Sequence, residues 1–570
     1  MLVLLLSACS GDDGGDDDAS DTTEGSTTTT APPPTSTEAD GPDGTVVLAD
    51  NPDSTLSAVV TVTTDAPATA ALVATSADGH QVDLPAGAEP ATELELPLVG
   101  LRPETEYEVA VEAAGADGTP LDLGAPVPFT TGALPDDFPP ITLESVDQER
   151  TQPGLTLLSL KPWAPPTGDG APAPAQGEGQ AGGYLAAVDQ EGEVVWYHGT
   201  EGGVLDARQT DTGYLYTYDE LVVREVDALG RITEELAGRV ATENPEDLTG
   251  QARTTDAAVP VDTDSAHHDA GPLPSGNLLW LSTGLEEVTG PPLCGEDEDE
   301  VTYPVIYDVV VEVEPDSGEV VGEWSLADVY DPFERPGTEM CIEGSTFAPP
   351  NFFYPVDGVV DWTHGNSVVL DEERNALIVS LRHQSAVLAL RYQDDADGPA
   401  GELLWELGPE GDLPLDGLAP SYQHAAEVLP DGTILVYDNG NQHPGATAGE
   451  EGDDPPFSRA VIYEVDDSSD DPADWTARQI WEHRLEGEGG RPVFTGFLGD
   501  VDRLDNDDVL VTHGAISDAD GALSARVVEV DRDDAAADGG DVVFDLRVGT
   551  PDDPWTVYRS QRIASALPGA

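Results

Sequence analysis

Residues 361–385 read DWTHGNSVVLDEERNALIVSLRHQS, and their pattern is that of a β-hairpin. Two apolar runs, 368–370 and 377–381, flank the turn-forming polar cluster 371–375. Antiparallel pairing returns a chain to the end of the sheet from which it started. The hairpin therefore predicts that three polar side chains meet at one edge of a sheet: His364, Asn366 and Arg382. An imidazole, an amide and a guanidinium placed together suit an anionic substrate.

The same strand–turn–strand pattern recurs in stretches that begin near residues 204, 267, 424 and 499. The units continue into a third strand that ends in an acidic turn and a fourth strand that often carries tryptophan. Repeated units of four antiparallel strands are typical of β-propeller blades. We therefore predict an all-β protein with a six-bladed β-propeller. Its blades are expected at 155–197, completed by a C-terminal strand near 555–563, and at 204–237, 267–326, 364–407, 424–485 and 498–548.

Short alternating strands, including 56–63 and 70–74, predict a small β-sandwich before the propeller. The segment LVGLRPETEY, which ends at Tyr107, resembles the corner of fibronectin type III modules, where a tyrosine hydroxyl bonds back to the preceding turn. The predicted organisation is a lipoprotein signal segment at 1–9, an acidic Thr- and Pro-rich tether without fixed structure at 10–43, the β-sandwich at 44–132, a short linker, and the catalytic propeller at 141–570.

The charge of the chain excludes some partners. Lys and Arg number 22 against 113 Asp and Glu, which gives a formal net charge of -91. Self-repulsion on this scale argues against binding nucleic acid or anionic lipid surfaces. The composition is typical of proteins that stay soluble in concentrated salt, where the Debye length falls to about 3 Å near 1 M.

The N-terminal sequence predicts export and a lipid anchor. Leu6-Ser7-Ala8-Cys9 resembles a bacterial lipobox, in which Cys9 is lipidated and becomes the mature N-terminus. The apolar run before it is short and lacks a basic region, so we expect the natural start to lie upstream. No other segment approaches the ~20 apolar residues that span a bilayer. The chain is therefore expected at the cell surface or in the periplasm, held to the membrane only by lipid.

Two further cysteines, Cys294 and Cys341, lie in loop-like surroundings. Export implies an oxidising compartment, so a disulfide between them is favoured over two free thiols. Their spacing matches no zinc motif. Three stretches, 284–304, 327–360 and 440–458, are longer than usual connections and are predicted to cover one face of the propeller as lids.

Three consecutive blades begin with histidine, at His267-His268, His364 and His424. Innermost propeller strands start near the axis at one face, so these imidazoles should surround one pocket. A single histidine at a strand start is ordinarily structural, whereas three at equivalent positions indicate a site. The ends of the second strands return to the same face and add further polar residues: Arg382, Asp438, Asn439 and His513.

Two kinds of chemistry fit such a cluster. Three imidazoles could bind Zn²⁺ or Cu²⁺, but Arg382 repels cations and no carboxylate is evident at the three strand starts. Alternatively, one histidine attacks sulfur or phosphorus while the other imidazoles and the arginine stabilise charge on the transferred oxygens. The donors favour an anion, and we predict no metal and no other cofactor.

Several ordered motifs resemble those of the bacterial arylsulfate sulfotransferases. They are HHD before LPSGN at 267–277, DWTHGNS at 361–367, SLRHQS at 380–385, and QH at 423–424 followed by PDG and DNG. The resemblance covers about residue 44 to the C-terminus. It implies an exported six-bladed propeller with a small N-terminal β-sandwich. It also implies a ping-pong reaction without a nucleotide donor, in which an aryl sulfate passes its sulfuryl group to a histidine and then to a phenol.

The resemblance implies a role for each matching residue. His424 matches the nucleophile, His268 and His364 match the flanking catalytic histidines, and Arg382 matches the sulfate-binding arginine. The remaining residues are expected to bind substrate or to support the site: Asn366 in the same motif, Thr495 in FTGF at 494–497, His267, His383 and His513. The acidic loops over the pocket depart from the family and bear on acceptor preference.

Fold and motifs can persist on a protein that only binds, so two other functions stay open. One is a non-enzymatic extracellular propeller lipoprotein that binds a ligand or partner at this face. The other is a metal hydrolase built on the histidines. The expected partners are a small-molecule aryl sulfate donor and a phenolic acceptor, with no nucleic acid. The sequence does not indicate an oligomeric state.

Overall fold

The computed structural model describes residues 36–87, 89–163, 182–243, 254–291, 300–336, 359–443, 455–518 and 521–570. Regular structure in these residues is almost entirely β-strand, which confirms the predicted all-β class. The short helical segments are α1 (Arg239–Glu243), η1 (Leu326–Asp328), η3 (Pro472–Asp474) and η4 (Glu488–Gly490). No helix among the described residues is long and apolar enough to cross a membrane.

The N-terminal β-sandwich is built around one long strand, β3 (Ala58–Ser76). Its first half pairs with β2 and β5, and its second half pairs with β4 and β6. The prediction of two strands at 56–63 and 70–74 is therefore wrong. Asp65, Ala66 and Pro67 are exposed where the pairing partners change, so the missing N–H of proline costs no ladder bond. The other strands are β1 (Ser36–Gly41), β2 (Gly44–Asp50), β4 (Gln81–Leu84), β5 (Ala91–Leu98), β6 (Glu106–Gly115), β7 (Pro120–Leu121) and β8 (Val127–Thr130).

Strand β1 corrects the predicted tether. Residues Ser36–Gly41 pair antiparallel with β2, although 10–43 were expected to lack structure. Their polar sequence, STEADG, concealed an edge strand, because such a strand can be held by backbone hydrogen bonds without an apolar face.

The tyrosine corner of the sandwich is confirmed. The backbone N–H of Arg102 donates to Tyr107 Oη at 2.9 Å, and the Tyr107 ring is fully buried. The corner therefore closes on itself as the motif predicts.

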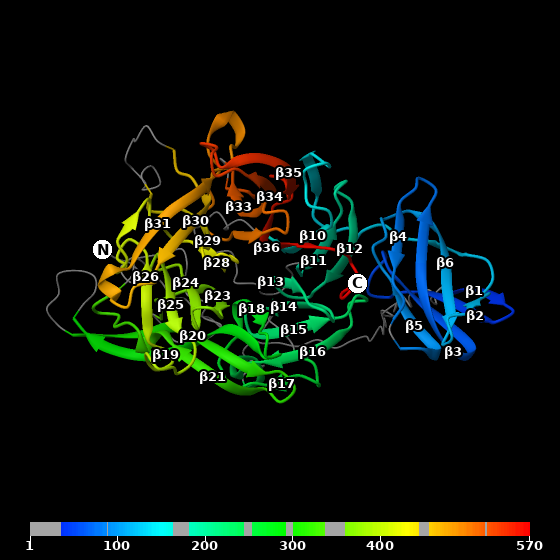
Figure 1. Ribbon diagram of the computed structural model, residues 1–570, viewed down its shortest axis with the longest axis horizontal. Helices are drawn as coiled ribbons and strands as arrows, with labels where there is room; N and C mark the ends of the chain where they lie inside the picture. The colour runs from blue at the N-terminus through cyan, green and yellow to red at the C-terminus, as the bar shows by residue number, and fades with distance from the viewer. Residues whose placement is uncertain are drawn as a thin grey trace, which may run out of the picture. The chain divides into compact units, whose positions relative to one another are not determined.

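Six sheets follow and confirm the six blades of the propeller (Figure 1). In Figure 1 the inner strands β13, β18, β23 and β28 converge on the middle of the propeller. Blade i contains β10 (Leu155–Pro162), β11 (Tyr184–Val188), β12 (Val194–Gly199) and β36 (Trp555–Ile563). Blade ii contains β13 (Val204–Gln209), β14 (Tyr214–Tyr218), β15 (Val222–Val226), β16 (Ile232–Ala237) and β17 (Val259–Pro260). Blade iii contains β18 (His267–Pro272), β19 (Leu278–Gly290), β20 (Val301–Glu314), β21 (Glu319–Ser325) and β22 (Val360–Asp361). Blade iv contains β23 (Gly365–Asp371), β24 (Ala376–Leu381), β25 (Ala386–Arg391) and β26 (Leu403–Leu407). Blade v contains β28 (His424–Val428), β29 (Ile434–Asp438), β30 (Arg459–Asp466), β31 (Thr476–His483) and β27 (Leu415–Asp416). Blade vi contains β32 (Asp500–Arg503), β33 (Val509–Ser517), β34 (Leu523–Arg532), β35 (Gly540–Val548) and β9 (Ile141–Val146).

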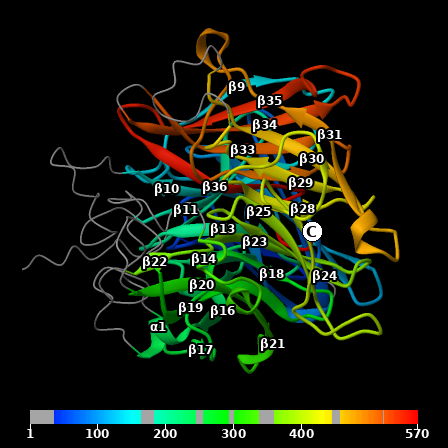
Figure 2. The same cartoon turned by 90° about the vertical axis from the view of Figure 1, so that its left-hand side faces the viewer.

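The propeller is closed by two strands that are distant in sequence from their partners. The predicted closure of blade i is confirmed, because C-terminal β36 pairs antiparallel with β10. A second closure was not predicted: β9 pairs with β35 of blade vi, and Figure 2 shows the two strands side by side. Both ends of the propeller sequence are thus held by backbone pairing.

The blades pack through strands that are apolar on both faces. Every residue of β24 and β25 is buried. Ile378 and Ala389 pack toward blade v, whereas the alternate residues Leu377 and Leu388 pack toward blade iii. Burying a side chain such as leucine contributes about 1.5–3 kcal/mol. Because successive residues face two different blades, these strands are continuously apolar instead of alternating.

The described residues revise the predicted lids. Stretch 284–304 is not a loop throughout, because β19 runs to Gly290 and β20 starts at Val301, pairing as one long hairpin. Its charged sequence suggested a loop, but backbone pairing extends past the buried part of the blade. Most of the other two stretches, and the three cysteines Cys9, Cys294 and Cys341, lie outside the described residues. The lipidation and the disulfide therefore stay predictions.

Candidate active site

Three neighbouring blades begin with the same irregularity at the predicted histidines. In β18, β23 and β28 the strand pairing slips between His267 and Ala270, between Gly365 and Ser367, and between His424 and Ala426. A β-bulge of this kind bends a strand and re-aims its side chains. Beside each slip one non-glycine residue has a positive φ: 58° at His268, 50° at His364 and 46° at Ala425. Such conformations cost about 1–3 kcal/mol each and are concentrated at functional sites.

The bulges bring the predicted imidazoles together. The ring centroids of His268 and His364 are 4.9 Å apart, at 75° to one another. The charges of Arg382 and His364 act on His424, and His424 in turn acts on His268. The four residues predicted to be catalytic therefore form one cluster, supplied by blades iii, iv and v.

His424 is held in one orientation by Asn439. Its Nδ1 lies 2.7 Å from Asn439 Oδ1, and both residues are buried. The Asn439 amide is fixed because its Nδ2 donates to the carbonyls of Thr495 and Leu498, each at 2.8 Å. Asn439 Oδ1 must therefore accept, so His424 carries its proton on Nδ1. Its Nε2 keeps a lone pair.

Burial lowers the pKa of His424 well below its ordinary value, and the positive charge of Arg382 acts in the same direction. The imidazole is consequently neutral around neutral pH. A neutral ring with a fixed tautomer is the form that can act as a nucleophile.

Arg382 is positioned by backbone and by an aromatic ring. Its Nη2 donates to the carbonyl of Gly496 at 3.0 Å, and its Cζ lies 4.7 Å from the ring centroid of Tyr422. Its backbone N–H donates to the carbonyl of His364 at 3.0 Å, as the hairpin predicts. A guanidinium held in this way loses little rotamer freedom when it binds an anion.

Asn366 and Thr495 lie behind the imidazoles and are fully buried. Asn366 Nδ2 donates to the carbonyl of Gln423 at 2.7 Å, next to His424. Thr495 bonds through Oγ1 to Tyr437 Oη at 2.7 Å and through its carbonyl to Asn439. In the structure both residues support the nucleophile position, and a direct contact with substrate stays a prediction.

His267 contacts His268 through its ring. The two Nδ1 atoms are 2.8 Å apart, and His267 Nε2 lies 3.3 Å from Asp308 Oδ1. Burial opposes charge on His267, yet Asp308 outweighs it and the pKa of His267 is raised. By contrast, burial and then the charge of His364 lower the pKa of His268.

His513 lies deeper than expected. Its Nδ1 bonds to Tyr437 Oη at 2.8 Å, and burial lowers its pKa to about 3. It supports the Tyr437–Thr495 contact.

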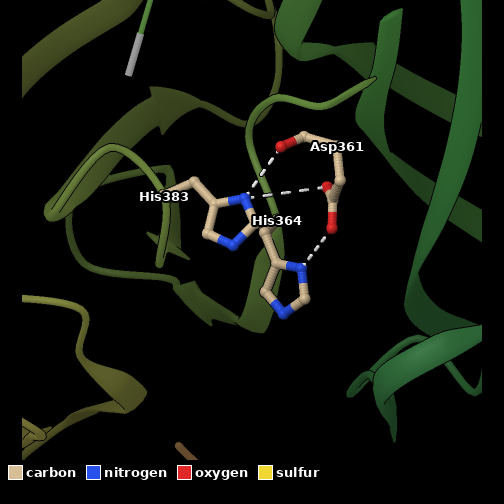
Figure 3. Close-up of side chains that lie close together, drawn as sticks. All are labelled: Asp361, His364 and His383. Carbon is tan, nitrogen blue, oxygen red and sulfur yellow. Dashed lines mark hydrogen bonds and ion pairs between the residues drawn. The ribbon is translucent and has the colours of Figure 1, made fainter. Parts of the chain in front are cut away.

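Asp361, His364 and His383 form a further group, shown in Figure 3, whose donor atoms lie within 4.8 Å of one another. The expectation of no carboxylate at the strand starts is therefore wrong. Asp361 lies on β22, which pairs parallel with β20, and it precedes His364 by three residues. Two imidazoles and a carboxylate can bind a transition metal, but only with the ligating nitrogens deprotonated. Here His364 Nδ1 lies 2.6 Å from Asp361 Oδ2 and His383 Nδ1 lies 2.8 Å from the Asp361 carbonyl, which is hydrogen-bonding geometry.

Arg559, on the closing strand β36, was not predicted to belong to the site. Its Nη2 donates to the carbonyl of Asn366 at 2.9 Å. Its guanidinium also lies within 4.0 Å of three buried carboxylates from blades ii, iii and vi: Asp206, Asp269 and Asp500. The only available signal was an arginine in a chain with few basic residues. Because its charge is balanced by these carboxylates, we assign Arg559 a structural role in which its ion pairs link blades ii, iii and vi.

Fold and site together define an all-β six-bladed propeller whose clustered imidazoles and fixed guanidinium suit a tetrahedral anion. The arylsulfotransferase (ASST) family model matches residues 144–559, and the arylsulfotransferase Ig-like domain model matches residues 51–123. The chain belongs to the arylsulfotransferase family, which confirms the resemblance found in the motifs.

A named relative is arylsulfate sulfotransferase AssT of Escherichia coli O6:H1 strain CFT073. It is 23% identical over 416 residues, which cover 61% of this chain and 62% of the relative. The match therefore spans less than two thirds of that relative.

Proposed function

We propose that the protein is an arylsulfate sulfotransferase that transfers a sulfuryl group from an aryl sulfate to a phenol through a sulfohistidine at His424. Family membership supports sulfotransfer in general. The observation that carries the histidine step is the bond of 2.7 Å between His424 Nδ1 and Asn439 Oδ1, which leaves Nε2 free to attack.

The first half-reaction follows from this tautomer. The Nε2 lone pair of His424 attacks sulfur, the bond from sulfur to the aryl oxygen breaks, and the phenolate leaves with the electron pair. The attacking ring gains positive charge, which the Asn439 oxygen at Nδ1 stabilises. In the second half-reaction a phenol oxygen attacks the same sulfur while the phenol hydroxyl proton passes to a neighbouring imidazole, and the sulfur–nitrogen bond breaks with its electron pair returning to His424 Nε2.

The neighbouring donors face a group that keeps its negative oxygens throughout. Arg382 offers a fixed positive charge, and the rings of His268 and His364 lie next to one another in the same cluster. Donors that are oriented in advance stabilise a transition state without having to reorganise, and removing one of them costs about 10²–10³ in rate. We therefore assign these three residues to the sulfuryl oxygens and to proton transfer.

The test uses purified protein with p-nitrophenyl sulfate, with and without added phenol. We expect nitrophenol release that requires phenol, together with formation of phenyl sulfate. Release without any acceptor would instead indicate a sulfatase. No release with any donor would favour a binding propeller, and loss of activity to chelators would favour a metal hydrolase.

The cellular context is part of the proposal. We propose that the protein is exported, lipidated at Cys9 and held at the membrane by that lipid, with Cys294 and Cys341 paired. The support is sequence alone, namely the lipobox pattern and the acidic, Thr- and Pro-rich composition that follows it. This placement would give the pocket access to phenolic compounds outside the cytoplasm.

A further inference from the structure

The proposed reaction gives no role to Asp361, whose carboxylate is bonded to His364 in the pocket. Its Oδ2 lies 2.6 Å from His364 Nδ1, and its backbone carbonyl accepts a hydrogen bond from His383 Nδ1 at 2.8 Å (Figure 3). The rings of His364 and His383 stack with centroids 4.4 Å apart at 25°. His364 is therefore held at its edge by Asp361 and at its face by His383.

These contacts fix the protons. Burial opposes charge on Asp361, but the adjacent His364 and His383 outweigh it, so the pKa of Asp361 is lowered and the carboxylate stays ionised. An ionised carboxylate only accepts hydrogen bonds, so His364 must donate from Nδ1. Its Nε2 is then the nitrogen at which a proton is gained or lost. Burial, followed by the charge of His364, lowers the pKa of His383 to about 3, so His383 remains a neutral support.

His364 differs from the other pocket histidines in this respect. His424 Nδ1 faces an amide oxygen, and His268 Nδ1 faces another imidazole. Within the described part of the chain, His364 is the one of these three whose ring is bonded directly to a carboxylate. That carboxylate can balance the positive charge of a ring that carries a second proton.

We propose that Asp361 is a positioning residue that makes His364 the proton-transfer group of the reaction. This inference rests on the sulfotransferase function proposed above. In the first half-reaction the His364 Nε2 proton passes to the aryl oxygen as its bond to sulfur breaks. In the second, the hydroxyl proton of the acceptor phenol passes back to His364 Nε2 as the phenol oxygen bonds to sulfur. The proton count is restored over the cycle.

The test compares Asp361→Asn with wild type on two donors. Asparagine keeps the size and a hydrogen-bond acceptor but removes the charge. p-Nitrophenolate leaves readily without a proton, whereas the more basic phenolate needs one. General acid catalysis contributes about 10²–10⁴ in rate, so we expect a loss of about 10²-fold or more with phenyl sulfate and under tenfold with p-nitrophenyl sulfate. The loss should be in kcat rather than KM.

The matched control is Asp371→Asn, at the far end of strand β23, which begins next to His364. Asp371 is buried and paired, with its Oδ2 2.6 Å from Arg374 Nη1. Any loss in this variant should be equal for both donors, as expected of a purely structural effect. Activity of Asp361→Asn on p-nitrophenyl sulfate shows that the variant is folded.

Equal losses on both donors in Asp361→Asn would overturn the assignment of Asp361 while leaving the sulfotransferase proposal intact. Loss of wild-type activity on chelation, with recovery on adding Zn²⁺, would also overturn it, because the three residues would then be metal ligands. Failure of wild type to transfer sulfuryl from either donor would instead refute the proposed function.

Discussion

The reaction rate in mild acid should distinguish the buried His424 from a histidine with an ordinary pKa. Only the neutral ring can attack sulfur. An imidazole with the usual pKa of about 6.5 is only about one tenth neutral at pH 5.5, so an unperturbed nucleophile would lose about tenfold in rate between pH 7.5 and 5.5. Burial and Arg382 lower the pKa of His424 well below that value. The ring then stays neutral through this range, and we expect a loss of less than twofold.

The assay is the pH dependence of kcat/KM for p-nitrophenyl sulfate at constant high salt, read at the isosbestic wavelength of nitrophenol. This parameter reports groups of the free enzyme. p-Nitrophenolate leaves readily without a proton, so proton donation to the leaving group does not limit this measurement. A tenfold fall centred near pH 6.5, with the slope of one proton, would refute the argument that burial keeps His424 neutral.

Three further predictions concern Asn439, two buried acidic side chains and Cys9. Asn439→Ala removes the acceptor at His424 Nδ1 and the donor to the carbonyls of Thr495 and Leu498. It should reduce the rate of sulfuryl transfer about 10²-fold and lower the free energy of unfolding by about 2–6 kcal/mol. Wild-type turnover in this variant would contradict the role of the amide. Burial raises the pKa of Glu427 to about 7 and that of Asp500 to about 6. Because these folded-state values lie above the unfolded ones, stability is lost as pH rises through 6–7, and Tm should be higher at pH 5 than at pH 8; the opposite trend in a thermal scan at fixed salt would count against it. Labelling with a lipid precursor should modify the full-length protein and fail for Cys9→Ala, and equal labelling of the two would exclude Cys9 as the acceptor.

Much of the fold could be predicted because each blade repeats the same local pattern. The hairpins at His364 and His424 carry their own turn and strand signals, and the repeat then places their starts at one axis. Strand β9 was missed because ITLESV is half exposed and pairs only at the rim of blade vi, so its sequence resembles a linker. The continuity of β3 past Pro67 likewise depends on neighbours on both sides, which local propensity does not show.

The candidate site was predictable in its members but not in its electrostatics. Histidines at equivalent repeat positions identify the cluster without a structure. Asp361 lies only three residues before His364, but the spacing does not show that the two side chains are bonded. The lowered pKa of His424 comes from burial by several blades, which is not a local effect. The sequence could therefore name the imidazoles but could not say which is neutral and which is bonded to a carboxylate.

The most direct test of the central claim is to incubate the enzyme with an aryl sulfate alone and map the sulfuryl adduct by mass spectrometry. We expect one adduct, on His424, which forms without acceptor, disappears when phenol is added and is absent from His424→Ala. An adduct on His268 or His364, or an undiminished adduct in His424→Ala, would contradict it.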